Sequence, residues 1–209
     1  MAYKEYPALE IVDIEGNEQD SNWLERVWGA QLKRAEDCPD GRFEPGVPLF
    51  RIVRIEEKEG PATQMVRVVD ADGNPLSGVH VARTWPGVED FEPHVQPRSR
   101  WYNNGVFGME GTDANGLIGF GMGRGDYLKG PGTGVSSVWI LSGEYFTDIL
   151  DKLGMMPETN HRTLLPTFRL TEVTPEEPGP APELPNEAVN ILIEFFETAA
   201  NRLRQLGGG

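Results

Sequence analysis

The stretch "VRVVDADGNPLSGVHVARTW", residues 66–85, contains two apolar runs separated by a dense group of turn-forming residues. Gly73 accepts a positive φ, Asn74 tolerates one, and Pro75 fixes its own φ without donating an amide hydrogen bond. These residues favour a tight connection between two antiparallel strands. Calcium binding is the alternative, but the stretch lacks the further acidic positions and the terminal glutamate of a helix-loop-helix calcium site. The sequence therefore predicts a turn.

A second stretch, "GTDANGLIGF" at residues 111–120, repeats the pattern, with Asp113, Asn115 and Gly116 ahead of another apolar run. Together with "VVDADGNPLSGVHV" and the later "GDYL", it resembles the carboxypeptidase regulatory-like domains over residues 66–128. In these small transthyretin-like β-sandwiches the first hairpin reads D-x-x-G-x-P-L-x-G-V-x-V, and a later hairpin reads T-D-x-x-G-x-x-x-F.

The resemblance implies a module without catalytic activity, such as an accessory part of a secreted enzyme, a surface protein or a sugar-binding appendage. The chain departs from the family pattern between Trp85 and Gly111. A long insertion rich in aromatic residues stands there in place of a short strand and turn.

Short apolar runs between Gly, Pro, Asn and Asp predict that residues 47–173 form an all-β sandwich of antiparallel strands, transthyretin-like or Ig-like. Residues 1–46 are expected to form an N-terminal arm with a helix at 22–36, capped by Ser21 or Asn22. One interval, "GEYFTDILDKLGMM" at 143–156, is also compatible with a short helix on the sandwich edge.

The 209 residues carry a formal net charge of −14, which opposes binding to the phosphates of nucleic acid and to anionic membranes. Cys38 is the one cysteine, so no disulfide can form within the chain. The sequence has no apolar run long enough to span a membrane and no apolar signal core at its start. An extracellular protein and a component of a particle both remain compatible with it.

Aromatic residues in and beside the Gly-rich loops are the candidates for ligand binding. Exposed aromatic rings stack on the apolar C–H face of a sugar, and neighbouring Asn and His side chains hydrogen-bond to its hydroxyls. Trp85 and Trp139 are also expected at strand ends, where they would fill the core. The predicted ligand-binding residues are Trp85, Trp101, Tyr102, Asn103, Tyr127 and His161.

Catalytic and metal-binding motifs do not emerge from the sequence. The three histidines are scattered without the close spacing of metal ligands, and no G-x-S-x-G elbow occurs. A pair of carboxylates for glycoside hydrolysis stays open, since its members can be distant in sequence. The sequence therefore predicts no catalytic residues, no metal and no cofactor.

The C-terminal part begins with a linker at 174–185, "TPEEPGPAPELP", in which prolines favour an extended chain. An amphipathic helix is predicted at 186–206. Such a helix needs a partner for its apolar face, either its own domain, another copy or another protein. Its seven-residue seam consists of Val189, Leu192, Phe196, Ala199, Leu203 and Leu206.

Three functions follow from these features. The first is a non-catalytic binding module for carbohydrate or another surface ligand, with the C-terminal helix serving oligomerisation or attachment. The second is a structural subunit of a virion or surface assembly, and the third is a glycan-active enzyme.

Overall fold

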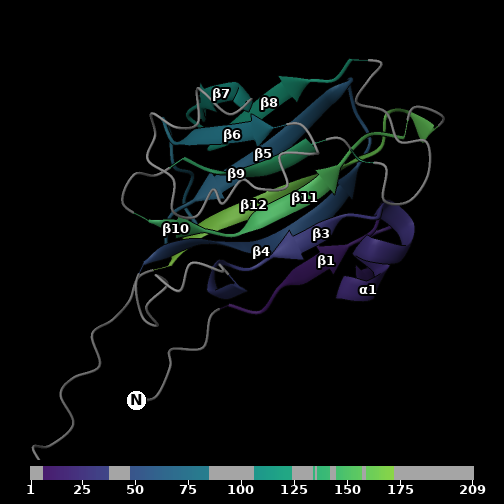
Figure 1. Cartoon of the computed structure of the whole chain (residues 1–209), viewed down its shortest axis with the longest axis horizontal. Helices are drawn as coiled ribbons and strands as arrows, with labels where there is room; N and C mark the ends of the chain where they lie inside the picture. The colour runs from purple at the N-terminus through teal and green to yellow at the C-terminus, as the bar shows by residue number, and fades with distance from the viewer. Residues whose placement is uncertain are drawn as a thin grey trace, which may run out of the picture. The chain divides into compact units, whose positions relative to one another are not determined.

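The computed structural model describes residues 7–37, 48–84, 106–123, 134, 136–141, 145–156 and 159–171. All of them belong to the first of the two units into which the chain divides, Met1–Val173 and Thr174–Gly209. They are mostly β-strand, in two sheets with short helical segments, which is compatible with a β-sandwich (Figure 1). The predicted linker at 174–185 and helix at 186–206 lie outside the described residues.

The first sheet, sheet A, has the strand order β2-β1-β4-β12-β5-β8, with β10 pairing with the start of β4. Its strands are β1 (Glu10–Val12), β2 (Glu18–Gln19), β4 (Leu49–Lys58), β5 (Thr63–Val69), β8 (Leu117–Gly121), β10 (Phe146–Thr147) and β12 (Thr163–Thr171). The prediction of antiparallel pairing is wrong at three places in this sheet. Strands β1 and β10 pair in parallel with β4, and β12 lies between β4 and β5 and is parallel to β5.

The second sheet, sheet B, has the order β3-β11-β9-β6-β7 and is antiparallel throughout. Its strands are β3 (Gln31–Lys33), β6 (His80–Thr84), β7 (Val106–Gly111), β9 (Ser136–Ile140) and β11 (Ile149–Leu153). The interval at 143–156 is therefore not a helix. Its described part forms β10 and β11, because Ile149 and Leu150 pair with β3 and Leu150 also pairs with β9.

The main core contains apolar side chains of both sheets. Alternate residues of a strand point to opposite faces, and Val66 and Val68 of β5 meet Val138 and Ile140 of β9 in the same cluster. A smaller cluster of Ala82, Trp139 and Ile149 lies on the other face of sheet B. Trp139 is buried as expected, but in this smaller cluster and not in the core between the sheets, whereas Trp85 lies outside the described residues.

The helix predicted at 22–36 is shorter than expected. The helical segment comprises α1 (Ser21–Trp23) and η1 (Leu24–Trp28), and Asp20, not Ser21 or Asn22, caps it by accepting a hydrogen bond from Trp23 N at 2.9 Å. Gly29 adopts φ +62°, which ends the helix. Residues 31–33 then pair with β11 as β3, so tertiary pairing overrides their helical propensity.

The N-terminal segment is also not an arm that stands apart from the sheets. Strands β1 and β2 extend sheet A, and β3 extends sheet B, before η2 (Ala35–Asp37) follows. Trp23, Leu24 and Trp28 are buried in the main core. Figure 1 shows the helical segment near β1 and β3.

Candidate functional site

The acidic turn at residues 70–74 uses its carboxylate within its own backbone. Asp70 Oδ1 accepts hydrogen bonds from Asp72 N at 2.9 Å and Asn74 N at 2.8 Å. Hydrogen bonds from Asn74 and from the turn amides lower the pKa of Asp70. Gly73 has φ +90°, and Arg169 Nε of β12 donates to Ala71 O at 2.8 Å. The predicted turn is confirmed, but the expected pairing of the strands on its two sides is wrong: β5 belongs to sheet A and β6 to sheet B, and Val69 and Pro75 form an isolated bridge across the turn.

The turn at residues 113–117 has the same geometry. Asp113 Oδ1 accepts from Asn115 N at 2.8 Å and from Leu117 N at 2.9 Å, and these bonds lower its pKa. Gly116 adopts φ +68° and lies against β5, because a Cβ added to it would be 2.3 Å from Val68 O. The positive φ favours glycine at position 116, and the short distance to Val68 O leaves no room for a Cβ.

Sequence reasoning missed a third copy of this turn, "DIEGN" at residues 13–17. Asp13 Oδ1 accepts from Glu15 N at 3.1 Å and from Asn17 N at 2.8 Å, and Gly16 has φ +87°. Desolvation would raise the pKa of Asp13, but the hydrogen bonds from Asn17 and its neighbours outweigh it and lower the pKa. The D-x-x-G spacing, repeated three times, was the signal that would have revealed it.

Thr112 joins the turn at 113–117 to the segment that follows the turn at 70–74. Its hydroxyl donates to Leu76 O at 2.5 Å and accepts from Val79 N at 3.1 Å. Its backbone O accepts from Gly78 N at 2.8 Å, and its N donates to Val79 O at 2.9 Å. The two sequence motifs are thus bonded side by side, and we call this end of the sheets the turn end.

The opposite end of the sheets, here the loop end, is defined by the strand termini Thr63, Thr84, Val106, Gly121, Ser136 and Thr163. Thr84 pairs with Val106 and with Ser137, and Thr63 pairs with Gly121. Arg83 connects the two sheets there, with Nε donating to Ser136 Oγ at 3.0 Å and Nη1 donating to Gly121 O at 3.1 Å. These contacts bring the termini of both sheets together.

Polar side chains reach the space between the sheets at the loop end, and sequence reasoning did not single them out. Arg83 is 2% exposed, and Gln64 is fully buried. Within the described residues, neither amide atom of Gln64 has a hydrogen-bond partner. Both residues stand in strands that mix polar and apolar residues, β5 "TQMVRVV" and β6 "HVART", so residue type alone does not tell which of their polar side chains point inward.

Of the six predicted ligand-binding residues, the structure describes His161 alone. It lies in the connection from β11 to β12, at the loop end, where Asn160 and His161 adopt φ +56° and +58°. A positive φ is uncommon outside glycine, but Asn and His are among the residues that adopt it most often. Arg162 pairs with Met156 across this connection. Trp85, Trp101, Tyr102, Asn103 and Tyr127 lie outside the described residues, as does the seam from Val189 to Leu206.

Arg162, the residue after His161, binds a buried carboxylate. Its Nη2 donates to Glu57 Oε1, and Glu57 Oε2 accepts from Ile14 N at 3.1 Å. Burial raises the pKa of Glu57, and the charge of Arg162 offsets only part of this effect. This pair therefore connects β4 with the residue before β12 and, through Ile14 N, with the segment after β1.

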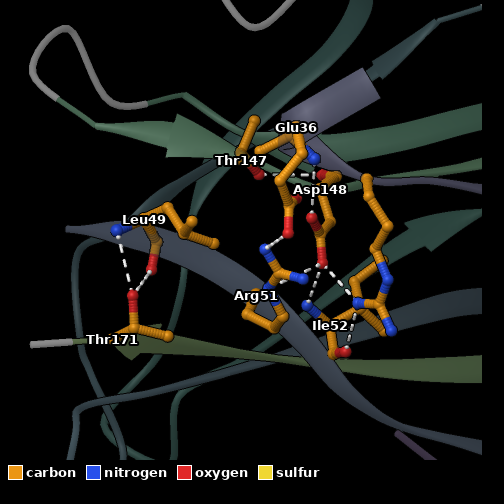
Figure 2. Close-up of polar contacts among 9 residues, drawn as sticks. Glu36, Leu49, Arg51, Ile52, Thr147, Asp148 and Thr171 are labelled. Carbon is orange, nitrogen blue, oxygen red and sulfur yellow. Dashed lines mark hydrogen bonds and ion pairs between the residues drawn. The ribbon is translucent and has the colours of Figure 1, made fainter. Parts of the chain in front are cut away.

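A second buried carboxylate connects the two sheets where the chain passes from β10 to β11 (Figure 2). The Asp148 side chain is fully buried and accepts from Arg34 Nη1 at 2.6 Å, Ala35 N at 3.0 Å and Ile52 N at 2.9 Å. Arg51 Nε lies 3.7 Å from Asp148 Oδ2, and Arg51 Nη2 donates to Glu36 Oε1 at 2.7 Å. Buried charges are tolerated when they are paired and hydrogen-bonded in this way.

A polar group lies on the face of sheet B that points away from the main core. Lys33 Nζ is 2.8 Å from Asp151 Oδ2, and Ser137 Oγ donates to Asp151 Oδ1. Burial would raise the pKa of Asp151, but the hydrogen bonds from Lys33 and Ser137 outweigh it and lower the pKa. The positive charge of Lys33 is thus paired with the negative charge of Asp151.

The described residues contain no group of three or more His, Cys, Asp and Glu side chains that could hold a metal ion. They also contain no helix with the length and apolar character required to cross a bilayer. Comparisons of the chain with protein-family models, curated proteins and solved structures found no significant match.

Proposed function

We propose that the protein is a non-catalytic binding module that recognises carbohydrate with aromatic and polar side chains carried at the loop end. The observation that carries the proposal is that the strand termini next to these residues in the chain all lie at the loop end. Trp85 follows Thr84 directly, and Trp101, Tyr102 and Asn103 come shortly before Val106 in the chain. Tyr127 follows β8, and His161 precedes β12.

All of these attachment points belong to one end of a rigid pair of sheets, which is the usual way in which a β-scaffold supports a binding site. At the turn end, the carboxylates of Asp70 and Asp113 are already used by the hydrogen bonds of their own turns. Aromatic rings supply apolar faces for sugar rings, and Asn103 and His161 supply hydrogen-bonding groups.

We also propose that the two sheets form a sandwich of the carboxypeptidase regulatory-like, transthyretin-like kind. The support is that the two motifs of the resemblance are bonded to each other through Thr112, which is the T of the T-D-x-x-G motif. The threonine before the turn is explained by its hydroxyl, which bonds to the backbone of Leu76 and Val79 in the segment after the first motif.

The test of ligand binding is a glycan array or a pull-down with insoluble polysaccharides, using the full chain. Trp101→Ala and Tyr102→Ala are expected to abolish the signal, because each removes a stacking surface. Asp72→Ala, at the exposed turn end, is the control and should bind as the unaltered chain does. Equal binding by all four proteins would overturn the proposed site.

The proposed role of the C-terminal helix is oligomerisation or attachment. It rests on the seam from Val189 to Leu206 and on the preceding proline-rich linker. Light scattering should show a species larger than one chain, and removal of residues 186–206 should reduce it. A single-chain mass before the deletion contradicts this part of the proposal.

A further inference from the structure

Strand β11 contains a bulge near the loop end. Leu150 pairs with Val138, and three residues later Leu153 pairs with Ser136. Two residues of β11 therefore lie opposite one residue of β9. Successive side chains of a regular strand point to opposite faces, yet both leucines belong to the main core. The extra residue allows this, and it keeps Lys152 out of the main core.

Lys152 has a backbone angle that is unusual for a lysine. Its φ is +59°, in the left-handed region that glycine adopts freely and other residues rarely enter. Close packing fixes the backbone there, since a Cβ added to Gly134 would be 1.7 Å from Lys152 O. In one common kind of bulge, the residue with positive φ is a glycine. Lysine therefore has a conformational cost at this position that glycine would avoid.

Residues held in such conformations concentrate at functional sites, so the side chain of Lys152 is a candidate for a function. Lys152 is half-buried. Its backbone N donates to Asp151 Oδ1 at 2.9 Å. Its ammonium group forms no hydrogen bond and no ion pair with any residue that the structure describes.

The cations nearest to Lys152 in the fold are already paired. Lys33 Nζ lies 2.8 Å from Asp151 Oδ2, and Arg162 binds Glu57. Lys152 thus adds a positive charge at the loop end that is not paired within the described part of the chain. A half-buried cation of this kind is suited to a negatively charged ligand group, because a charge-assisted hydrogen bond would compensate for its burial.

Lys152 also lies close to the attachment point of one candidate aromatic residue. Ser137 donates to Asp151, the neighbour of Lys152, and pairs with Thr84 of β6. Trp85 follows Thr84 directly in the chain. Strands β11 and β6 are separated by β9 alone, so they are about 10 Å apart. A short oligosaccharide is long enough to span this distance.

We propose that Lys152 binds a negatively charged group of the ligand and that this ligand is an acidic carbohydrate, with carboxylate or sulfate groups. The inference rests on the proposed binding of carbohydrate at the loop end. An ammonium group forms stronger hydrogen bonds with an anionic oxygen than with a neutral hydroxyl. The net charge of −14 opposes an acidic ligand at long range, but salt screens this repulsion far more than it screens a half-buried contact.

The test is calorimetric titration of the full chain with three short probes: a neutral galactan oligosaccharide, an oligogalacturonide and a sulfated carrageenan oligosaccharide. At least one acidic probe should bind more tightly than the neutral one, and the two acidic probes separate carboxylate from sulfate recognition. Lys152→Gln should weaken the binding of that acidic probe by about tenfold or more and leave the binding of the neutral probe unchanged.

Lys58→Gln is the matched control for net charge. It removes the same formal charge as Lys152→Gln, but Lys58 is already paired with Glu56 at 3.2 Å. The affinity for the acidic probe should therefore change by less than about twofold in this variant. An equal loss in both variants would show an effect of net charge and would overturn the inference.

Lys152→Gly separates a binding role from a structural one. Glycine adopts the positive φ without strain, so this variant should unfold in urea at a concentration no lower than that of the unaltered chain. It should nevertheless lose the tighter binding of the acidic probe, as Lys152→Gln does. A clear loss of stability in Lys152→Gly would show that the lysine supports the fold, and the inference would be wrong.

Failure of the inference differs from failure of the proposed function. The inference fails if neither acidic probe binds, or if Lys152→Gln binds them as tightly as the unaltered chain. The proposed function stands in that case if the neutral probe binds and Trp101→Ala abolishes its signal.

Discussion

Glu56 and Glu57 are adjacent in β4 but point to opposite faces of sheet A and have pKa values shifted in opposite directions. Glu57 is 1% exposed and bound to Arg162, and burial raises its pKa. Burial would also raise the pKa of Glu56, but hydrogen bonds from Arg54 and Lys58 on the outer face outweigh it and lower the pKa. Two neighbouring carboxylates of one strand therefore stabilise the fold in opposite pH ranges.

Substituting these two residues should separate their contributions to stability. Both carboxyls have an ordinary pKa of 4.5. The pKa of Glu57 is raised in the folded chain, so its contribution to the free energy of unfolding is complete below pH 4.5. This contribution is lost as the pH rises from 4.5 through the folded-state pKa. The lowered pKa of Glu56 means that its stabilisation is present above 4.5 and is lost as pH falls through the folded-state pKa.

Urea denaturation across this pH range measures the difference. The advantage of the unaltered chain over Glu57→Gln should shrink as pH rises, and its advantage over Glu56→Gln should shrink as pH falls. If both advantages shrink in the same direction, the opposite assignments of these carboxylates are wrong.

Removal of the Asp148 carboxylate should be strongly destabilising. Asp148→Ala removes the carboxylate that pairs with Arg34 and that accepts from the amides of Ala35 and Ile52. Breaking a buried ion pair in this way lowers the free energy of unfolding by about 3–5 kcal/mol. Glu36→Gln changes the half-exposed end of the same group and should stay within about 1 kcal/mol. Thermal or urea unfolding of both variants checks this order, and equal losses would contradict it.

The two glycines of the turns should respond differently to the same substitution. Gly73→Ala adds a Cβ in open space at positive φ and should lose about 1–2 kcal/mol through backbone strain alone. Gly116→Ala has a similar strain and in addition places its Cβ 2.3 Å from Val68 O. It should therefore unfold at a lower urea concentration than Gly73→Ala. Equal midpoints would show that the contact with β5 relaxes freely.

Replacement of Thr112 should weaken the connection between the two turn-containing segments. Thr112→Val keeps the shape but leaves Val79 N and Leu76 O without the hydroxyl, at an expected loss of about 1–3 kcal/mol. Thr112→Ser keeps the hydroxyl and is the control, with a loss below about 1 kcal/mol. Amide exchange of Val79 provides a local check, since faster exchange is expected in the valine variant only.

The turns illustrate what can be predicted from sequence. In the turn that begins at Asp70, the carboxylate bonds to amides two and four residues later, so the short string "DADGN" contains all the groups that it needs. The same holds at Asp113 and at Asp13, although the third copy went unnoticed. The mostly β character of the described residues follows similarly from short apolar runs between such turns.

The candidate site was predictable to a smaller extent. Its aromatic residues were chosen by type, and His161 is the member whose position the structure describes. The polar residues between the sheets at the loop end, Arg83 and Gln64, were missed because their strands also carry polar residues that are not fully buried, such as Arg67 and His80. Their inward orientation depends on which face of each strand meets the core, and that is a property of the assembled sheets.

Local hydrogen bonds between residues at most four apart were thus determined by the sequence itself. The tertiary structure decided where the helix after Asp20 ends, that β12 separates β4 from β5, and that Asp148 holds Arg34 and Ile52 together. The contacts of Asp148 span 114 and 96 residues of chain, respectively. A contact of that separation forms only when the two sheets have already brought distant strands together, because no local preference specifies its partner.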